Sequence, residues 1–109
     1  MAKFMALFVG NPGTAPPDAA TIAKGMQAWG EWMAKHAAHL VDMGGPLGKT
    51  KKVSAGGIAE TQNSIGGYVI VEAADHDTAA RMFENHPQFM IFPGEGVEVM
   101  PILPIPTGP

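Results

Sequence analysis

The sequence predicts an α+β fold of the ferredoxin-like type, in which two helices cover one face of a four-stranded antiparallel sheet. Two observations carry this prediction. Six segments have strand or helix periodicity, and they follow one another in the order β-α-β-β-α-β. The 109 residues, with 14 glycines and 10 prolines, suit one domain with well-marked breaks between its elements. The predicted elements are residues 3–9, 19–43, 50–54, 67–73, 76–85 and 97–103.

Four of these segments have the composition of strands. Residues 3–9 are apolar on both faces, which indicates a central strand buried on two sides. Residues 50–54 contain two lysines, which suit a sheet edge because charge discourages further pairing. Residues 67–73 are the strongest strand signal, and residues 97–103 complete the sheet and the domain. The proline-rich tail, residues 104–109, cannot continue a sheet interior and is expected to be an extended arm.

The first helix is predicted over residues 19–43, beginning at Asp18 or Thr21 and ending at the Gly-Gly-Pro sequence of residues 44–46. One continuous apolar stripe at helical spacing supports it. The stripe consists of Ile22, Met26, Trp29, Met33, Ala37 and Leu40.

A shorter helix is predicted over residues 76–85, with Asp75 as its N-cap and Pro87 after its end. Residues 58–65 are polar and are expected to be irregular. The segment after Pro87 is expected to be an unusually apolar loop.

Composition excludes several classes of function. A net charge of −3, from 7 basic and 10 acidic residues, provides no electrostatic surface for nucleic acid. The absence of cysteine excludes disulfides and thiolate catalysis, and no apolar run approaches the roughly 18 residues of a membrane span. We therefore expect a cytoplasmic protein with neither a nucleic-acid nor a membrane partner.

The balance of charged and apolar residues predicts self-association. Charged residues make up only 16% of the chain, while 46% are hydrophobic. That charge is too little to cover a small monomer comfortably. We expect another copy of the chain to cover part of the apolar surface, giving a homodimer.

Seven segments, taken in order, resemble the YCII-related family and in particular its DGPF-type branch. They are residues 3–8 (KFMALF), 26–29 (MQAW), 40–48 (LVDMGGPLG), 52–54 (KVS), 66–73 (GGYVIVEA), 85–87 (NHP) and 96–101 (GVEVMP). The resemblance implies a ferredoxin-like subunit and a homodimer whose two sheets form a dimeric α/β barrel. Some YCII-like proteins are thought to use a His–Asp pair, and one relative removes chloride from a chlorinated hydroxyquinol. Where the family histidine lies on the first helix, this chain has Trp29-Gly30, and residues 55–61 replace the Asp-Gly-Pro-Phe loop.

Histidines are the residues best suited to proton transfer near neutral pH. His36 lies at the border of the predicted stripe, where it is either a general base facing a cavity or a half-exposed packing residue. His86 is an alternative base, or a histidine that interacts with the end of the short helix. His39 and Asp42 are three residues apart, which suits a surface ion pair or a base with its orienting carboxylate. His76, beside Asp75, is expected at the surface.

Four aromatic residues are predicted to shape a ligand cavity between helix and sheet. They are Trp29, Trp32, Tyr68 and Phe89. No pattern of ligands predicts a metal site, and no phosphate-binding loop predicts a nucleotide cofactor, so we expect neither.

Two functions remain open at this point. The chain is either a non-catalytic module that binds a small molecule or a partner as a homodimer, or a cofactor-independent enzyme. The enzyme would act on a small cyclic or phenolic molecule with His36, or alternatively His86, as general base.

Overall fold

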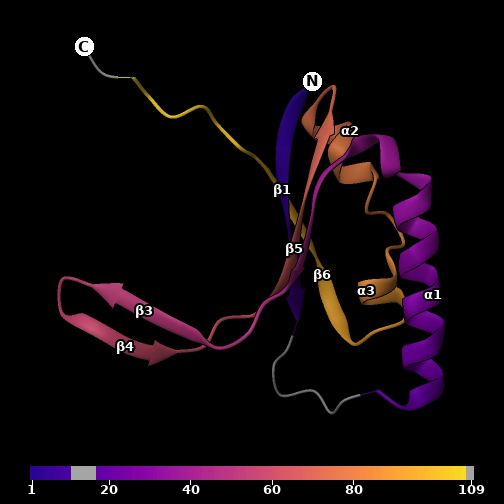
Figure 1. Cartoon of the computed structure of the whole chain (residues 1–109), viewed down its shortest axis with the longest axis horizontal. Helices are drawn as coiled ribbons and strands as arrows, with labels where there is room; N and C mark the ends of the chain where they lie inside the picture. Colours follow the sequence, from indigo (N-terminus) through magenta and orange to yellow (C-terminus); the bar gives the residue numbers. More distant parts are fainter. Residues whose placement is uncertain (11–16, 108–109) are drawn as a thin grey trace.

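The computed structural model describes residues 1–10 and 17–107 (Figure 1). Its helices are α1 (Ala19–Lys35), the 3-10 helix η1 (Ala37–His39), α2 (His76–Arg81) and α3 (Pro87–Met90). Its strands are β1 (Ala2–Gly10), β2 (Leu40–Pro46), β3 (Thr50–Ser54), β4 (Gly57–Thr61), β5 (Ile65–Ala73) and β6 (Gly94–Pro101).

The main sheet has four strands in the order β2-β5-β1-β6, and every neighbouring pair is antiparallel. This is the strand order of a ferredoxin-like fold, so the predicted fold class is confirmed. The helices α1, α2 and α3 all lie on one side of the sheet (Figure 1). No helix in the described part of the chain is long and apolar enough to cross a membrane.

The core lies between the sheet and the helices. Alternate side chains of the two central strands face the helices and are buried, as the period of a strand requires. They are Phe4, Ala6 and Phe8 of β1 and Val69, Val71 and Ala73 of β5. Gly67 lies opposite Phe8 in the sheet, and a Cβ there would be 3.5 Å from the Phe8 ring. The glycine therefore leaves room for the phenyl group.

The other face of the sheet is apolar and open in the single chain. Met5 pairs with Ile70 on one side and with Met100 on the other, so an apolar row crosses three strands. Leu7 and Tyr68 pair beside this row. These side chains alternate with the buried ones of β1 and β5, and all of them are half-buried.

Both predicted aspartate caps are confirmed. Asp18 Oδ1 accepts a hydrogen bond from the Thr21 N–H at 2.7 Å and begins α1. Asp75 Oδ1 accepts from the Thr78 N–H at 2.7 Å and begins α2. These backbone hydrogen bonds stabilise the carboxylates, so the pKa of each aspartate is below its ordinary value.

The predicted helix over residues 19–43 is wrong in its last third. The α-helix ends at Lys35, and Leu40–Pro46 form the edge strand β2, hydrogen-bonded to β5. Gly44 has φ +63° and lies at a register irregularity of β2, with its N–H donating to Asp42 Oδ1 at 2.8 Å. A helix end and a β-bulge both use glycine at positive φ, so the sequence signal fits either one.

The predicted second sheet strand was also placed wrongly. Thr50–Ser54 is a strand, but it pairs with Gly57–Thr61 in a separate two-stranded hairpin. Residues 58–65 were expected to be irregular and instead supply β4 and the start of β5. In Figure 1 the hairpin projects from the main sheet on the side opposite α1.

The buried face of α1 is rotated from the predicted stripe. Ile22 and Met26 are 44% and 62% exposed, while Trp32 is 8% exposed and belongs to the core. The Trp32 indole N–H donates to the Met82 carbonyl oxygen at 2.7 Å, so its polar atom is satisfied inside the core.

The second half of the chain differs in smaller ways. The predicted helix over residues 76–85 ends as an α-helix at Arg81. The segment expected to be a loop contains α3 at Pro87–Met90. The last strand ends at Pro101, and residues 102–107 continue without regular secondary structure, all of them exposed.

We predict that Gly44→Ala lowers the free energy of unfolding by about 2–5 kcal/mol. A Cβ at this position would lie 1.8 Å from the Tyr68 carbonyl oxygen. The left-handed backbone adds ~1–2 kcal/mol to an overpacking cost of ~1–3 kcal/mol. Urea denaturation followed by tryptophan fluorescence measures the change.

Gly45→Ala is the matched control, because a Cβ there meets no atom within 4 Å and its φ is not positive. We expect its effect to stay within about 1 kcal/mol. Equal losses for the two variants would contradict the bulge at Gly44.

Candidate functional site

An apolar cleft of about 400 Å³ opens between α1 and the end of the main sheet. Its volume is in the range of small-molecule sites in proteins. It is lined by Phe8, Met26, Trp29, Met33, Met43, Gly45, Pro46, Gly66, Gly67, Tyr68, Gln88 and Phe92. None of these twelve residues carries a charge, and four of them are aromatic.

Gln88 lines the cleft with a side-chain carboxamide whose orientation is fixed by a hydrogen bond. The Trp29 indole N–H, which is only a donor, bonds to Gln88 Oε1 at 3.0 Å. The carboxamide is therefore held with its oxygen toward Trp29, and its Nε2 remains a donor. No acceptor for Nε2 occurs among residues 1–10 and 17–107 of the structure. The cleft thus offers a hydrogen-bond donor to a ligand.

Phe92 lines the cleft because α1 has no side chain at Gly25. A Cβ at Gly25 would lie 2.2 Å from the tip of the Phe92 ring. Gly30, in the same helix, has no such neighbour within 4 Å. The glycine at position 25 therefore permits close packing of the ring on the helix backbone and shapes one wall of the cleft.

His86 lies in an aromatic cluster next to the cleft and is 0% exposed. Its ring centroid is 4.4 Å from that of Trp29, 4.8 Å from Trp32 and 5.1 Å from Phe8. Its Nδ1 accepts the Gln88 N–H at 3.0 Å and so caps the N-terminus of α3. His86 therefore positions the helix that carries Gln88.

The protonation state of His86 follows from these contacts. Since Nδ1 accepts a hydrogen bond, the neutral ring carries its proton on Nε2. Nε2 is buried without a hydrogen-bond partner among the described residues, and its surroundings are aromatic rings. Burial, and to a smaller extent the positive charge of His36, lowers the pKa of His86 to about 4. The imidazole is therefore neutral at physiological pH.

His36 is the C-cap residue of α1, half-buried against the Trp32 ring at a centroid distance of 5.0 Å. Burial, followed by the positive charges of Lys35 and His39, lowers its pKa below the ordinary histidine value. It is therefore mostly neutral at pH 7 and able to accept a proton. It does not line the apolar cleft.

The structure separates His39 from Asp42. His39 lies in η1, and its Nδ1 donates to the Glu72 carbonyl oxygen at 3.2 Å. Asp42 lies in β2, and its Oδ1 accepts the N–H of Gly44 in the same strand. His39 and Asp42 were expected to be neighbours on one helix face, but they lie in different elements. His76 is exposed, as expected, and its Nε2 donates to the Val99 carbonyl oxygen at 2.7 Å.

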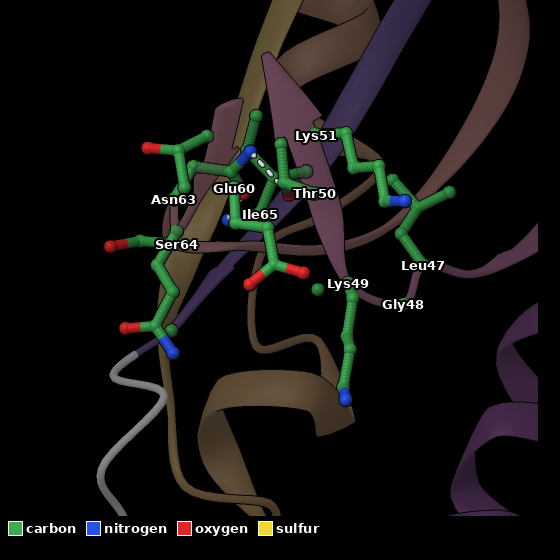
Figure 2. A pocket seen from close by; sticks show the side chains of 13 residues that line it. Leu47, Gly48, Lys49, Thr50, Lys51, Glu60, Asn63, Ser64 and Ile65 are labelled. Carbon is green, nitrogen blue, oxygen red and sulfur yellow. Dashed lines mark hydrogen bonds between the residues drawn. The ribbon is translucent and has the colours of Figure 1, made fainter. Parts of the chain in front are cut away.

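A second, polar hollow of about 730 Å³ lies at the base of the β3–β4 hairpin. Figure 2 shows the side chains of Lys49, Lys51 and Glu60 around it. The Asn63 side-chain amide donates to Thr50 Oγ1 at 3.1 Å across this base (Figure 2). The hollow is open to solvent and lined mostly by exposed residues.

The cleft therefore contains some of the aromatic residues predicted to form a cavity. Trp29 and Tyr68 line it, Trp32 lies in the core 6.0 Å from Trp29, and Phe89 of α3 is outside the cleft lining. Sequence reasoning missed Gln88, while Phe92 belongs to the apolar segment after Pro87 that was expected to be a loop over a ligand cavity or over the dimer interface. The only local signal was the density of apolar residues after Pro87.

Comparison with known protein families agrees with this fold. The family model of the YCII-related domain matches residues 2–105, which is nearly the whole chain. The chain belongs to the YCII-related family. Among curated proteins, none matches this YCII-related chain.

One solved structure is similar to this YCII-related chain over 90% of both chains, with a TM-score of 0.55 and 19% sequence identity. It is the 5-chloro-2-hydroxyhydroquinone dehydrochlorinase of Burkholderia phenoliruptrix in complex with 2,5-dihydroxybenzoquinone. At this identity the likeness shows the fold.

We predict that the stability of the protein depends on the titration of His86. The pKa is about 4 in the folded state and 6.5 when the ring is free, so only the unfolded chain takes up a proton between these values. The stabilisation from the neutral ring is complete above pH 6.5 and is lost as the pH falls toward 4. It amounts to about 3 kcal/mol. Urea denaturation at closely spaced pH values measures this loss.

His86→Asn is the matched variant, because asparagine caps a helix and does not titrate. We expect it to be less stable at pH 7 and to show a weaker decline between pH 6.5 and 4. An unchanged pH profile would assign the decline to other groups.

Proposed function

We propose that this YCII-related protein is a small-ligand-binding module that acts as a homodimer, with an uncharged, largely apolar ligand in the cleft beside Trp29 and Tyr68. The observation that carries the proposal is the lining of the cleft, which contains no charged residue. A charged ligand would lose its hydration there without gaining a counterion, which is unfavourable.

The shape of the ligand follows from the walls. Trp29, Phe92 and Phe8 present ring surfaces, and three methionines provide adaptable thioether contacts. Flat, cyclic molecules fit such walls best. The free Nε2–H of Gln88 favours a ligand that also carries a hydrogen-bond acceptor, such as a carbonyl oxygen.

The open face of the sheet supports the homodimer. Its row of Met5, Ile70 and Met100 is apolar and continuous across three strands. A second copy packed face to face would remove this row from water, and the low charge content of the chain favours such a contact.

We predict that the protein binds N-phenyl-1-naphthylamine, an uncharged fluorescent probe, at least about tenfold more tightly than 8-anilino-1-naphthalenesulfonate. The second probe has the same ring system with an added sulfonate, and the cleft has no cation to pair with it. Fluorescence titration measures both affinities. Equal or tighter binding of the sulfonate would contradict an uncharged ligand.

Two variants locate the bound probe. Met26 and Gln27 are neighbouring exposed residues of α1, but only Met26 lines the cleft. Met26→Glu should weaken binding of the uncharged probe about tenfold, while Gln27→Glu, with the same change of charge, should leave it within about twofold. Equal effects would place the probe elsewhere.

A second candidate function is a cofactor-independent enzyme that acts on a small phenolic molecule. The similar dehydrochlorinase fold and the proton-accepting state of His36 favour it. In this proposal His36 takes a proton from the phenolic hydroxyl. The partial exposure of His36 supports it over His86, which is buried and already bonded at Nδ1.

The enzymatic candidate predicts that the protein releases chloride from 5-chloro-2-hydroxyhydroquinone and that His36→Ala abolishes the release without lowering the melting temperature. A chloride electrode and thermal denaturation measure the two quantities. His76→Ala removes an exposed histidine from another helix and should retain the activity. Absence of chloride release from the unmodified protein would contradict this candidate for that substrate, and a lower melting temperature alone would give His36 a packing role.

A further inference from the structure

The β3–β4 hairpin is the most exposed part of the two sheets. Every residue from 51 to 61 is exposed, and the two strands pair only with each other in the described sheets. At the tip, Val53 and Ile58 form a cross-strand pair, and each is 73% exposed. An isolated two-stranded hairpin is at best marginally stable in water. A surface that covered this apolar pair would stabilise the hairpin.

One face of the hairpin combines an apolar pair with a pair of charged residues. Because side chains alternate along a strand, Val53 and Ile58 lie on the same face as the paired Lys51 and Glu60. Lys51 and Glu60 line the polar hollow at the base of the hairpin (Figure 2). The apolar pair and two residues that line the hollow therefore lie on one face of the hairpin.

Charge is divided unevenly between the hairpin region and the rest of the chain. Residues 49–61 contain three lysines and Glu60, for a net charge of +2. Since the whole chain carries −3, the remainder carries −5. The hairpin region and the rest of the chain therefore carry net charges of opposite sign, which favours contact between the hairpin of one copy and the remainder of another.

The chain exposes more surface than a compact monomer of its mass. A monomer of 11.4 kDa is expected to expose about 5,800 Å². This chain exposes 7595 Å², and its radius of gyration is 15.9 Å, against about 13 Å for a compact domain of this length. The excess exceeds the roughly 800 Å² that each partner buries in a stable interface.

We propose that the β3–β4 hairpin is an arm that docks on the acidic body of a second copy of this chain, with its Val53–Ile58 pair and the adjacent hollow against the partner. The proposal rests on the homodimer proposed above, and it adds the arm to the sheet-to-sheet contact. The hairpin projects from the same side of the sheet as the open apolar face, so one partner can meet both (Figure 1).

Sedimentation equilibrium tests the contribution of the arm to the dimer. We expect Val53→Ser combined with Ile58→Ser to raise the dimer dissociation constant by about tenfold or more, because apolar contact is lost at the interface. The matched control combines Ile22→Ser with Met90→Ser, two exposed apolar residues on the helical side of the sheet. It should leave the constant within about twofold.

A spin label shows directly where the arm lies. The chain has no cysteine, so Ala59→Cys provides a single attachment site on the hairpin. This labelled chain is mixed with unmodified chain enriched in ¹⁵N, and the amide spectrum of the ¹⁵N chain is recorded. We expect amides of the sheet and of acidic surface residues to broaden through contact between subunits.

The possible failures are distinguishable. A chain that stays monomeric at high concentration overturns both the arm and the homodimer, while probe binding in the cleft is measured separately. A dimer with an unchanged dissociation constant in the Val53→Ser, Ile58→Ser variant and no broadening between subunits overturns the arm alone.

Discussion

The hydrogen bond from the Gln88 backbone N–H to Nδ1 of His86 is the interaction on which the site depends. It begins α3, and α3 presents the Gln88 side chain to Trp29 of α1. Trp29 in turn forms a wall of the cleft. One buried imidazole thus connects a short helix to the long one. Because the ring is neutral, this connection costs no burial of charge.

The parts of the fold that depend on nearby residues could be predicted from the sequence. The caps at Asp18 and Asp75 involve partners three residues away, and the alternation of β1 and β5 is visible in each segment alone. The strand Leu40–Pro46 could not be predicted in this way, because it is fixed by pairing with β5. The helical spacing of residues 37–43 was overridden by that distant partner.

The same distinction applies to the site. Trp29 and Tyr68 were identifiable because each is a large aromatic residue within a segment whose periodicity already predicted a helix or a strand. Gln88 was not, because its importance comes from one hydrogen bond to a residue 59 positions away. The histidines show most clearly that hydrogen-bond partners far away in the chain cannot be predicted from the sequence. His39, His76 and His86 each bond to a backbone group, and no sequence pattern marks these partners.

The independence of the β3–β4 hairpin has an evolutionary consequence. Residues 51–61 are all exposed, so substitutions among them disturb the folding of their own subunit very little. The cleft lies on other elements and is insulated from such changes. In the dimer proposed above, two descendants of a gene duplication would diverge in the hairpin until their subunits no longer pair, while the cleft stays the same in both. The hairpin would then decide which subunits pair, so that each paralogue forms dimers only with itself.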